Sequence, residues 1–541
     1  MKFAPDGPDI PADLLLSHER GNVVFFCGAG ISKKAGLPLF SELVDQIYEN
    51  CCTYCAGKPF SNDKKENVSA HTEYAAYQRG QYDLVLNLLE QRLPGGRQAM
   101  VEALTQSLRP NFNLTDATVG HEALLKLATD RQSKHLRLVT TNYDSVFQEA
   151  AYRLGISLEN RIHSAPDLPY LQGEQWDSLV FLHGLLSDVQ CQSGKRLVFT
   201  SGDFGSAYLT ERWAARFVSD LFQQYDVCFV GYGVNDPVML YILSALQLSN
   251  SRKKVWIFTG YKDNDEDERS AVETGWFSRG ITPIFYDSHD GHQRLYDTLT
   301  RWAKQYALGI EGKLKIVENY AQRNPLTDKD RDFFVPLMLW ALTDPSGKPA
   351  EAFANTDPIP KWEWHSVFTD PRQCEPFLPA LGSHPRSVQN EHLFWRTVNS
   401  NLASRQALTT DDIMGPPRLD AVMRGLMLWL LHFVGDARCL LWVAQHSGRL
   451  QIQFRTQLWV KLNNANRECT TRAEAVQSSC QSVPDKYLRK LWDLLLAERI
   501  NHRPSTVSVG DWIEIFKKSG LTFACRSMLQ DNLRPRIHVY E

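Results

Sequence analysis

Four short motifs in the N-terminal half of this chain place glycines or polar side chains directly after an apolar run. They are Gly28-Ala29-Gly30-Ile31-Ser32, Thr141-Asn142-Tyr143-Asp144, His183-Gly184, and Gly231-Tyr232-Gly233 with the nearby Asp236. Glycines let a backbone approach a diphosphate closely, and the start of a following helix favours its negative charge. A histidine whose pKa lies near neutrality is a natural general base.

Each motif also has a structural interpretation when it is taken alone. A strand–helix turn of small residues needs no ligand, Asn-Tyr-Asp forms ordinary turns, and a single buried histidine more often packs than reacts. The first motif also departs from the dinucleotide fingerprint G-x-G-x-x-G, because Ile31 follows its second glycine and Lys33 occupies the place of the third. It is the order of the four motifs, each at the end of an apolar run, that favours one shared site.

The apolar runs predict short buried strands that alternate with helices. The expected strands are 22–27, 136–140, 178–182, 196–200, 226–230, 254–258 and 281–286. The expected helices between them are 39–50, 146–154, 207–224 and 237–248. Alternation of this kind predicts an α/β fold with a Rossmann-like, doubly wound parallel sheet. The polar, helix-compatible block at about 51–135 is predicted to be a helical insertion, and ligands are expected at the carboxyl ends of the strands.

The second half of the chain has a different pattern. Its apolar runs are longer and have helical spacing, at 333–342, 421–434, 487–499 and 512–518. Nine of the 14 tryptophans lie there, and Trp340, Trp429 and Trp492 fall within Leu-rich helical stretches. We expect two domains, 1–307 with the site and 308–541 as a mainly α-helical domain for sensing or assembly.

Composition excludes several classes of protein. With 43% hydrophobic and 22% charged residues and a formal net charge of −3, this is an ordinary globular chain with no bias towards polyanions, so direct sequence-specific nucleic acid binding is not expected. The 11 cysteines lack a disulfide framework, which indicates a reducing compartment. The apolar stretch 421–434 is too short to span a bilayer, and no signal peptide is recognisable, so we expect a cytoplasmic protein without membrane contact.

In their order, the four motifs resemble those of the sirtuin (Sir2-type) superfamily over about the first 307 residues. The resemblance implies an NAD-binding domain. Protein-deacylating sirtuins carry two Cys-x-x-Cys pairs for zinc between the HG motif and the late glycine turn, whereas this chain has only Cys191 and Cys228 there. Its one Cys-x-x-Cys, Cys52 to Cys55, stands alone in the insertion, so no metal is expected. The family's Asp-Phe-Arg is replaced by Leu39-Phe40-Ser41, which weakens the case for an acyl-lysine channel.

The chain more closely resembles the zinc-free sirtuin-like NADases of bacterial antiphage defence, which have a helical C-terminal domain. That resemblance implies hydrolysis of NAD, as substrate, to nicotinamide and ADP-ribose or cyclic ADP-ribose, with NAD depletion halting phage replication. It assigns catalysis to Asn142, which positions the water or ribose, and to His183 as general base. It assigns the diphosphate to Gly28, Ala29 and Ser32, the nicotinamide ribose or carboxamide to Asp144, and the adenosine side to Gly231, Gly233 and Asp236. Gly30, Thr141 and Tyr232 are expected to bind NAD as well.

Two alternatives stay open at this stage: a non-catalytic NAD or ADP-ribose sensor, and a zinc-free NAD-dependent deacylase. A free NADase would poison its host, so a resting restraint is expected, in the block 51–135 or in the C-terminal half. A homo-oligomer, a phage-protein activator and a HerA-like ATPase are the partners that the resemblance suggests.

Overall fold

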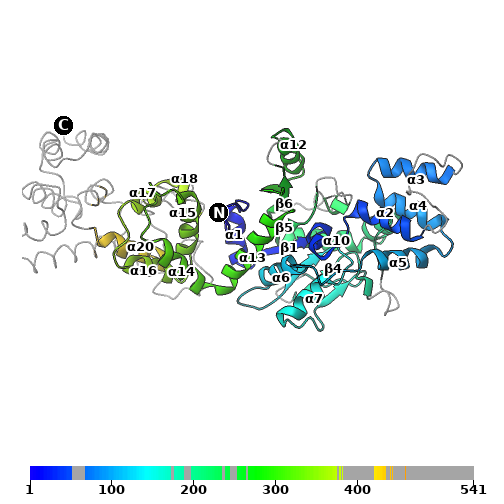
Figure 1. The fold of residues 1–541 in the computed structure, drawn as a ribbon. Coiled ribbons are helices and arrows are strands. Elements are labelled where there is room, and N and C mark those ends of the chain that lie inside the picture. Colours follow the sequence, from blue (N-terminus) through cyan, green and yellow to red (C-terminus); the bar gives the residue numbers. More distant parts are fainter. Residues whose placement is uncertain are drawn as a thin grey trace, which may run out of the picture. The chain divides into compact units, whose positions relative to one another are not determined.

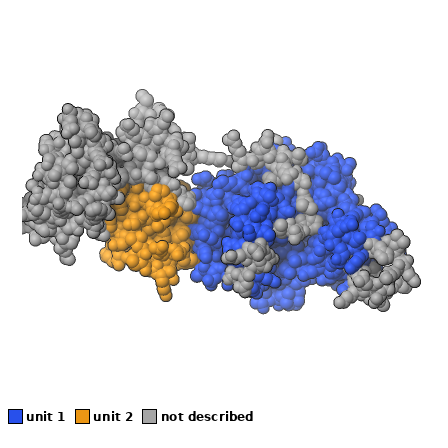
Figure 2. Space-filling view, turned by 90° about the horizontal axis from the view of Figure 1, so that it is seen from above, with its two compact units in different colours: residues 1–309 blue, residues 310–541 orange. Residues whose placement is uncertain are grey.

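The computed structural model describes residues 1–51, 68–171, 176–187, 196–233, 253–262, 266–374 and 419–433, with a few single positions and short stretches between and beyond them. The chain divides into two compact units, Met1–Gly309 and Ile310–Glu541, which Figure 2 colours separately. The expected boundary at 307/308 stands at the end of helix α13 (Gln293–Leu308).

The first unit is built on a seven-stranded sheet in the order β3-β4-β2-β1-β5-β6-β7 (Figure 1). Every neighbouring pair is parallel, as the fold prediction required. The strands are β1 (Val23–Cys27), β2 (Arg137–Thr140), β3 (Ile162–Ser164), β4 (Ser178–Phe181), β5 (Asp226–Val230), β6 (Val255–Tyr261) and β7 (Thr282–Asp287). The first strand lies in the middle of the sheet, with Cys27 opposite both Thr140 and Val230.

Helices cover both faces of this sheet because successive side chains of β1 point to opposite sides. Phe26 packs with Phe229, in the cluster that includes α10 (Trp213–Gln224). Phe25 points the other way, towards Trp302 of α13 and His18 of α1 (Ala12–Glu19). The remaining sheet helices are α6 (Val119–Ala128), α7 (Val146–Leu154), α9 (Ser201–Phe204) and α12 (Glu266–Phe277), with the 3₁₀ helix η1 (Ala29–Ala35) and the π-helix η2 (Gly205–Thr210).

Between β1 and β2 the chain forms the predicted helical insertion. Its helices are α2 (Phe40–Cys51), α3 (Val68–Gln78), α4 (Tyr82–Arg92) and α5 (Gly96–Ser107). Apolar residues one or two turns apart, such as Val44 and Ile47 on α2 and Leu86 and Leu89 on α4, form a core of their own. That core continues to Tyr143 beside β2, so the insertion packs against the site.

Three details of the first unit differ from the sequence-based prediction. Residues 196–200, expected to form a strand, are non-helical and pair with no strand, while the short strand β3 was not expected. The helix expected over 207–224 is broken in two, because η2 ends at Thr210 and Arg212 adopts a left-handed φ of 62° before α10 begins. The expected helix 237–248 lies mostly outside the described residues.

The described part of the second unit is helical throughout, in agreement with the predicted class. Its helices are α14 (Ile310–Tyr320), α15 (Arg331–Leu342), α16 (Lys348–Asn355), α17 (Trp364–Thr369), α18 (Pro371–Cys374) and α20 (Ala421–Leu431). Trp340, Trp364 and Trp429 are fully buried in its core. Helices α16 and α20 meet closely, since a Cβ atom on Gly425 would lie 2.6 Å from the backbone of Ala350. The predicted helices 487–499 and 512–518, with Trp492, lie outside the described residues.

Within the described ranges, the helices are all too short or too polar to cross a membrane.

Candidate functional site

The two glycine turns that follow β1 and β5 lock into each other through their backbones. The amide of Gly28 donates to the Val230 carbonyl at 2.9 Å, and the amide of Gly30 donates to the Gly231 carbonyl at 3.0 Å. A Cβ atom on Gly30 would lie 2.9 Å from the carbonyl oxygen of Gly231, whose own φ is +82°. These glycines are therefore required for turn-to-turn packing, whatever else they bind.

A free donor remains in the first turn. The amides of Gly28, Gly30 and Ile31 are all used by backbone carbonyls, whereas in the described part of the chain the Ala29 amide has no partner. Ala29 also lines the cleft described below. This amide is the group in the turn that is free to meet an anionic oxygen.

The hydroxyl of Ser32 is the centre of a buried polar network that joins the first two motifs. It lies 3.1 Å from the Asp144 Oδ2, the Asn142 Nδ2 and the His121 Nε2. A serine hydroxyl has one proton and two lone pairs. It therefore donates to Asp144 and accepts from Asn142 and from His121, which places the His121 proton on Nε2.

The orientation of Asn142 is set by its two acceptors. Its Nδ2 donates to the carbonyl of Gly28 at 3.2 Å as well as to Ser32. Because a backbone carbonyl only accepts, the amide cannot be flipped. The Oδ1 of Asn142 has no hydrogen-bond partner among the described residues, and the side chain lines the cleft. The structure thus brings together the predicted Asn142, Ser32, Asp144 and Gly28.

Burial alters the ionisation of this network. Desolvation raises the pKa of Asp144, although hydrogen bonds from the Val146 amide and the Ser32 hydroxyl oppose the rise. Desolvation also lowers the pKa of His121 to about 3, so this imidazole is neutral near pH 7. Its Nδ1 is buried without a partner.

Sequence reasoning missed His121, although it completes the network. It lies on α6 among buried apolar residues such as Leu124 and Leu125, and so resembles a core position. No motif in the sequence marks it, and Thr118, one helical turn earlier, would be a sufficient partner for its imidazole. Only the fold brings it to Ser32, 89 residues away in the chain.

The predicted adenosine-side residues have diverse surroundings. The Tyr232 hydroxyl donates to the carbonyl of Cys27 at 3.1 Å and lies 2.7 Å from the Thr141 hydroxyl, so it links both sheet halves. Its ring lies 2.7 Å from where a Cβ of Gly28 would stand. Gly233 is exposed with open space around it, and Asp236 lies outside the described residues.

His183, which follows β4, is fully buried. Its Nε2 lies 2.9 Å from the Tyr208 hydroxyl, and its Nδ1 has no partner. The rings of Phe204 and Tyr208 pack edge-on against the imidazole. Desolvation lowers the pKa of His183 to about 3. The structure therefore does not place His183 among the side chains that line the cleft beside Asn142.

An open cleft lies at the carboxyl ends of β1 and β2. It contains about 500 Å³ of free space, part of which is continuous with solvent. One wall is polar, and the other is apolar and comes from α2, the end of α5 and Val238. Its lining includes Ala29, Ser32, Thr141, Asn142 and Asp144 on the polar side, and Leu37, Phe40, Leu43 and Leu108 on the apolar side.

The cleft stands at the place where the chain changes direction across the sheet. Strands β2, β4 and β3 extend to one side of β1, and β5, β6 and β7 extend to the other. Open α/β sheets bind ligands at such switch points. A flat, uncharged ring would fit the apolar wall, with hydrogen-bonding groups turned towards Asn142.

Groups of three or more side chains arranged to hold a metal ion are not found among the described residues. Cys228 is buried in β5, and burial raises its pKa, so it is an inert thiol. Cys52, Cys55 and Cys191 lie outside the described residues.

Comparison with known proteins shows a similarity over part of the chain. Residues 136–284 form a segment that matches the family described as "SIR2-like domain". It includes the Asn142, His183 and Gly231 motifs and begins after the Gly28 turn. The chain is also 28% identical, over 327 residues, to uncharacterized protein y4cA of Sinorhizobium fredii. That match covers 59% of this chain and 25% of the relative, so the chain spans about a quarter of that protein's length.

Proposed function

We propose that this protein hydrolyses NAD to nicotinamide and ADP-ribose and acts in the bacterial cytoplasm as an antiphage effector that depletes NAD. One observation carries the proposal. The Asn142 amide is held by Gly28 and Ser32 so that its unpaired Oδ1 is presented at the cleft of a SIR2-like domain. A SIR2-like domain is associated with NAD, and an acceptor fixed in this way suits a nucleophilic water or a ribose hydroxyl.

The residues present fit an NAD molecule. The unpaired amide of Ala29 would meet a diphosphate oxygen, with Gly28 and Gly30 keeping the turn low enough for it to approach. Ser32 would contribute mainly through the network, because its hydroxyl is already saturated. Thr141 and Asp144 would lie beside the nicotinamide ribose or carboxamide, and Gly231, Tyr232, Gly233 and Asp236 would lie on the adenosine side.

The reaction needs positioning more than covalent help from the protein. Water adds to C1′ of the nicotinamide ribose as the glycosidic C–N bond breaks. The electrons of that bond leave with the ring nitrogen of nicotinamide, whose positive charge is thereby lost. One proton of the water is released, and His183 is the residue proposed to take it. If a group of ADP-ribose itself were the acceptor, the product would be cyclic ADP-ribose.

Absence of the zinc-site cysteine pairs from the sequence between His183 and Gly231 favours water over an acyl-lysine as the acceptor. No metal is assigned a role. Metal analysis of the purified full chain should find well under one zinc per chain. About one zinc per chain would reopen the zinc-dependent deacylase interpretation.

The direct test is nicotinamide release from NAD, followed by chromatography, with and without extract from phage-infected cells. The Asn142→Ala variant should lose the activity, and Asn113→Ala, which changes an exposed loop asparagine, should keep it. NAD that stays intact under every condition, including infection of expressing cells, would contradict the proposal.

A second candidate is a sensor that binds NAD or ADP-ribose without turnover. The burial of His183 away from the cleft favours it, because a base that cannot reach the substrate leaves only binding. Calorimetry would separate the two functions, since a sensor would bind NAD and release no nicotinamide. A zinc-free deacylase is a third and weaker alternative.

The unit Ile310–Glu541 is proposed to sense a trigger or build a homo-oligomer. A phage protein or a HerA-like ATPase is the kind of activating partner that the resemblance suggests. The test compares residues 1–309 alone with the full chain in mass, basal NAD turnover and response to infection. Identical behaviour of the two would exclude a regulatory role for the second unit.

A further inference from the structure

Two aromatic rings pack against His183, and a third ring packs against them. Phe204 and Tyr208 pack edge-on against the imidazole, and the Tyr208 hydroxyl lies 2.9 Å from its Nε2. Tyr241 stacks on Phe204, with ring centroids 4.5 Å apart and an angle of 7° between the planes. We call these three residues the aromatic cover.

The cover is tied to one face of helix α4 in the insertion. Asp83, Asn87 and Glu90 are spaced at i, i+4 and i+7, so they share a face of this helix. Asp83 accepts from the Tyr241 hydroxyl at 2.9 Å, and Asn87 accepts from the Gly202 amide at 3.3 Å. Each bond reaches a segment that carries a ring of the cover.

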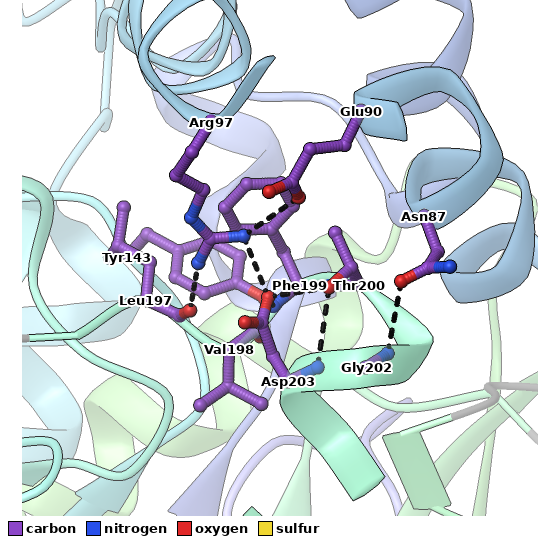
Figure 3. Close-up of polar contacts among 10 residues, drawn as sticks. All are labelled: Asn87, Glu90, Arg97, Tyr143, Leu197, Val198, Phe199, Thr200, Gly202 and Asp203. Atoms are coloured by element: carbon purple, nitrogen blue, oxygen red, sulfur yellow. Dashed lines mark hydrogen bonds and ion pairs between the residues drawn. The ribbon is translucent and has the colours of Figure 1, made fainter. Parts of the chain in front are cut away.

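Arg97 of α5 contacts α4, the loop before α9 and α9 itself (Figure 3). Its guanidinium lies between Glu90 and Asp203, at 3.1 and 2.9 Å, and donates to the Leu197 carbonyl at 2.5 Å. It also stacks over the ring of Phe199, 4.1 Å from the centroid. Arg97 thus holds the loop 197–199 and the start of α9 at the same time.

Asp203 connects Arg97 to the helix that carries part of the aromatic cover. Its Oδ2 accepts from the amides of Phe199 and Thr200, from the Thr200 hydroxyl and from Arg97. Together with the Thr200 hydroxyl, which accepts from the Asp203 amide, this forms a capping box at the start of α9 (Figure 3). Phe204 ends α9 and Tyr208 lies on the next helix, η2, so the position of the box determines where both rings lie.

The same loop also contacts the backbone of His183. The Val198 amide donates to the His183 carbonyl at 2.9 Å, and the Val198 carbonyl accepts from the Tyr143 hydroxyl at 2.7 Å. Tyr143 stands between Asn142 and Asp144, so the loop touches both halves of the candidate site.

We propose that Arg97, with the Asp83–Asn87–Glu90 face of α4, latches the aromatic cover over His183, so that the helical insertion controls access to this histidine. A base must reach its substrate, whereas His183 is fully buried and is not among the residues that line the cleft. A partner or ligand that displaces α4 or α5 would release Tyr208 and expose the imidazole. The segment is suited to such a change, because η2 is a π-helix and the left-handed Arg212 follows two residues after its end at Thr210.

The latch is tested by how fast diethyl pyrocarbonate modifies His183 in the full-length protein, mapped by peptide mass spectrometry. Arg97→Ala should speed this modification about tenfold or more, the opening expected when charge-assisted hydrogen bonds are lost. Arg97→Lys keeps the charge but lacks the several N–H donors of a guanidinium. The His183 modification rate in this variant should therefore lie between those of the unchanged protein and Arg97→Ala. Asn87→Ala removes one tie only and should give a smaller increase in a variant that folds.

Two internal controls separate a latch from general loosening. His121 is also fully buried but lies in the Ser32 network, so its modification rate should not change. Arg153→Ala is the matched control variant, since Arg153 is also half exposed, pairs with Glu149 and lies over the ring of Phe112. An unchanged His183 rate in Arg97→Ala, or parallel increases at His183 and His121, would overturn the latch.

This inference rests on the proposed function only for its activity arm. If that function holds, Arg97→Ala should also raise basal nicotinamide release several-fold. If His183 is uncovered as expected while NAD remains intact in every variant, the proposed function falls and the latch stands.

Discussion

Asn142 and His183 mark two halves of the candidate site, and the groups that surround them differ in polarity. Around Asn142, four polar side chains share hydrogen bonds through the Ser32 hydroxyl, and one acceptor is left facing the cleft. Around His183 the described neighbours include two aromatic rings, one of which carries a hydroxyl, and His183 does not line the cleft. We expect the first half to be preorganised for a ligand in the structure described, and the second to become accessible only after a movement.

The largest expected effect comes from replacing the imidazole of His183, which tests whether that half of the site takes part in the reaction. His183→Gln should lower nicotinamide release about 10²- to 10⁴-fold, the usual contribution of a general base. Glutamine retains a partner for Tyr208 and most of the volume, whereas alanine would leave a cavity at this fully buried position. Turnover by steady-state kinetics is the measurement. Full activity would remove His183 from the reaction and make the aromatic cover a purely structural feature.

Next in size is the loss of the preorganised half. Asn142→Ala should lower turnover about 10²- to 10³-fold, as removal of one positioned polar group at a reacting centre does. NAD binding, measured by calorimetry, should weaken much less, because Asn142 is expected to act on the reacting atoms. A variant that loses binding and turnover equally would show that Asn142 merely holds the ligand.

Acid should lower the stability of the folded protein, because each half of the site contains a buried, neutral histidine. Burial lowers the pKa of His121 and of His183 to about 3, against 6.5 in an unfolded chain. The unfolded state therefore binds more protons between pH 6.5 and 3, so stability is complete above pH 6.5 and falls as the pH drops through that window. At pH 5 each histidine costs about 2 kcal/mol of unfolding free energy.

Denaturant melts of the full chain at pH 7.5 and pH 5 measure this loss. His183→Gln should show a smaller difference between the two values than the unchanged protein. An identical difference would mean that His183 titrates normally, and that the aromatic cover is open in solution.

The smallest expected effect separates architecture from chemistry. Thr141→Val removes the contact with the Tyr232 hydroxyl, which keeps its bond to the Cys27 carbonyl. We expect a loss of about 1 kcal/mol in unfolding free energy, the net value of one hydrogen bond, and a modestly higher KM for NAD, because Thr141 is proposed to lie beside the nicotinamide ribose. Thermal denaturation and kinetics of the variant are the measurements. An unchanged KM would remove Thr141 from the proposed NAD site.

Much of the fold could be predicted because local patterns determine it. The strand before Gly28 is an uninterrupted apolar run. The sequence of α7 has the periodicity of an amphipathic helix, and the left-handed Gly155 follows its last residue. The stretch 196–200 misled the same reasoning. Its apolar residues Leu197, Val198 and Phe199 are buried by loop packing against the insertion, and an apolar run does not distinguish a strand from a buried loop.

The site could be predicted only in part, for a related reason. The motif order located Asn142, Asp144 and His183 at strand ends, where the structure has them. The partners that decide their state come from far along the chain: His121 for Ser32, and Tyr208 for His183. Such pairings depend on how α6 and η2 dock, and no spacing in the sequence records that.

The position of β1 in the middle of the sheet has a consequence for biosynthesis. Val23–Cys27 emerges first from the ribosome, but its neighbours begin at Arg137 and Asp226. At a synthesis rate of about 5–20 residues per second, β5 is made roughly 10–40 s after β1. Both edges of this fully apolar strand lack their partners until β2 is made, and the edge that pairs with β5 lacks its partner throughout. The nascent chain is therefore a natural client for a ribosome-associated chaperone, and slowing translation ahead of β5 should lower its soluble yield.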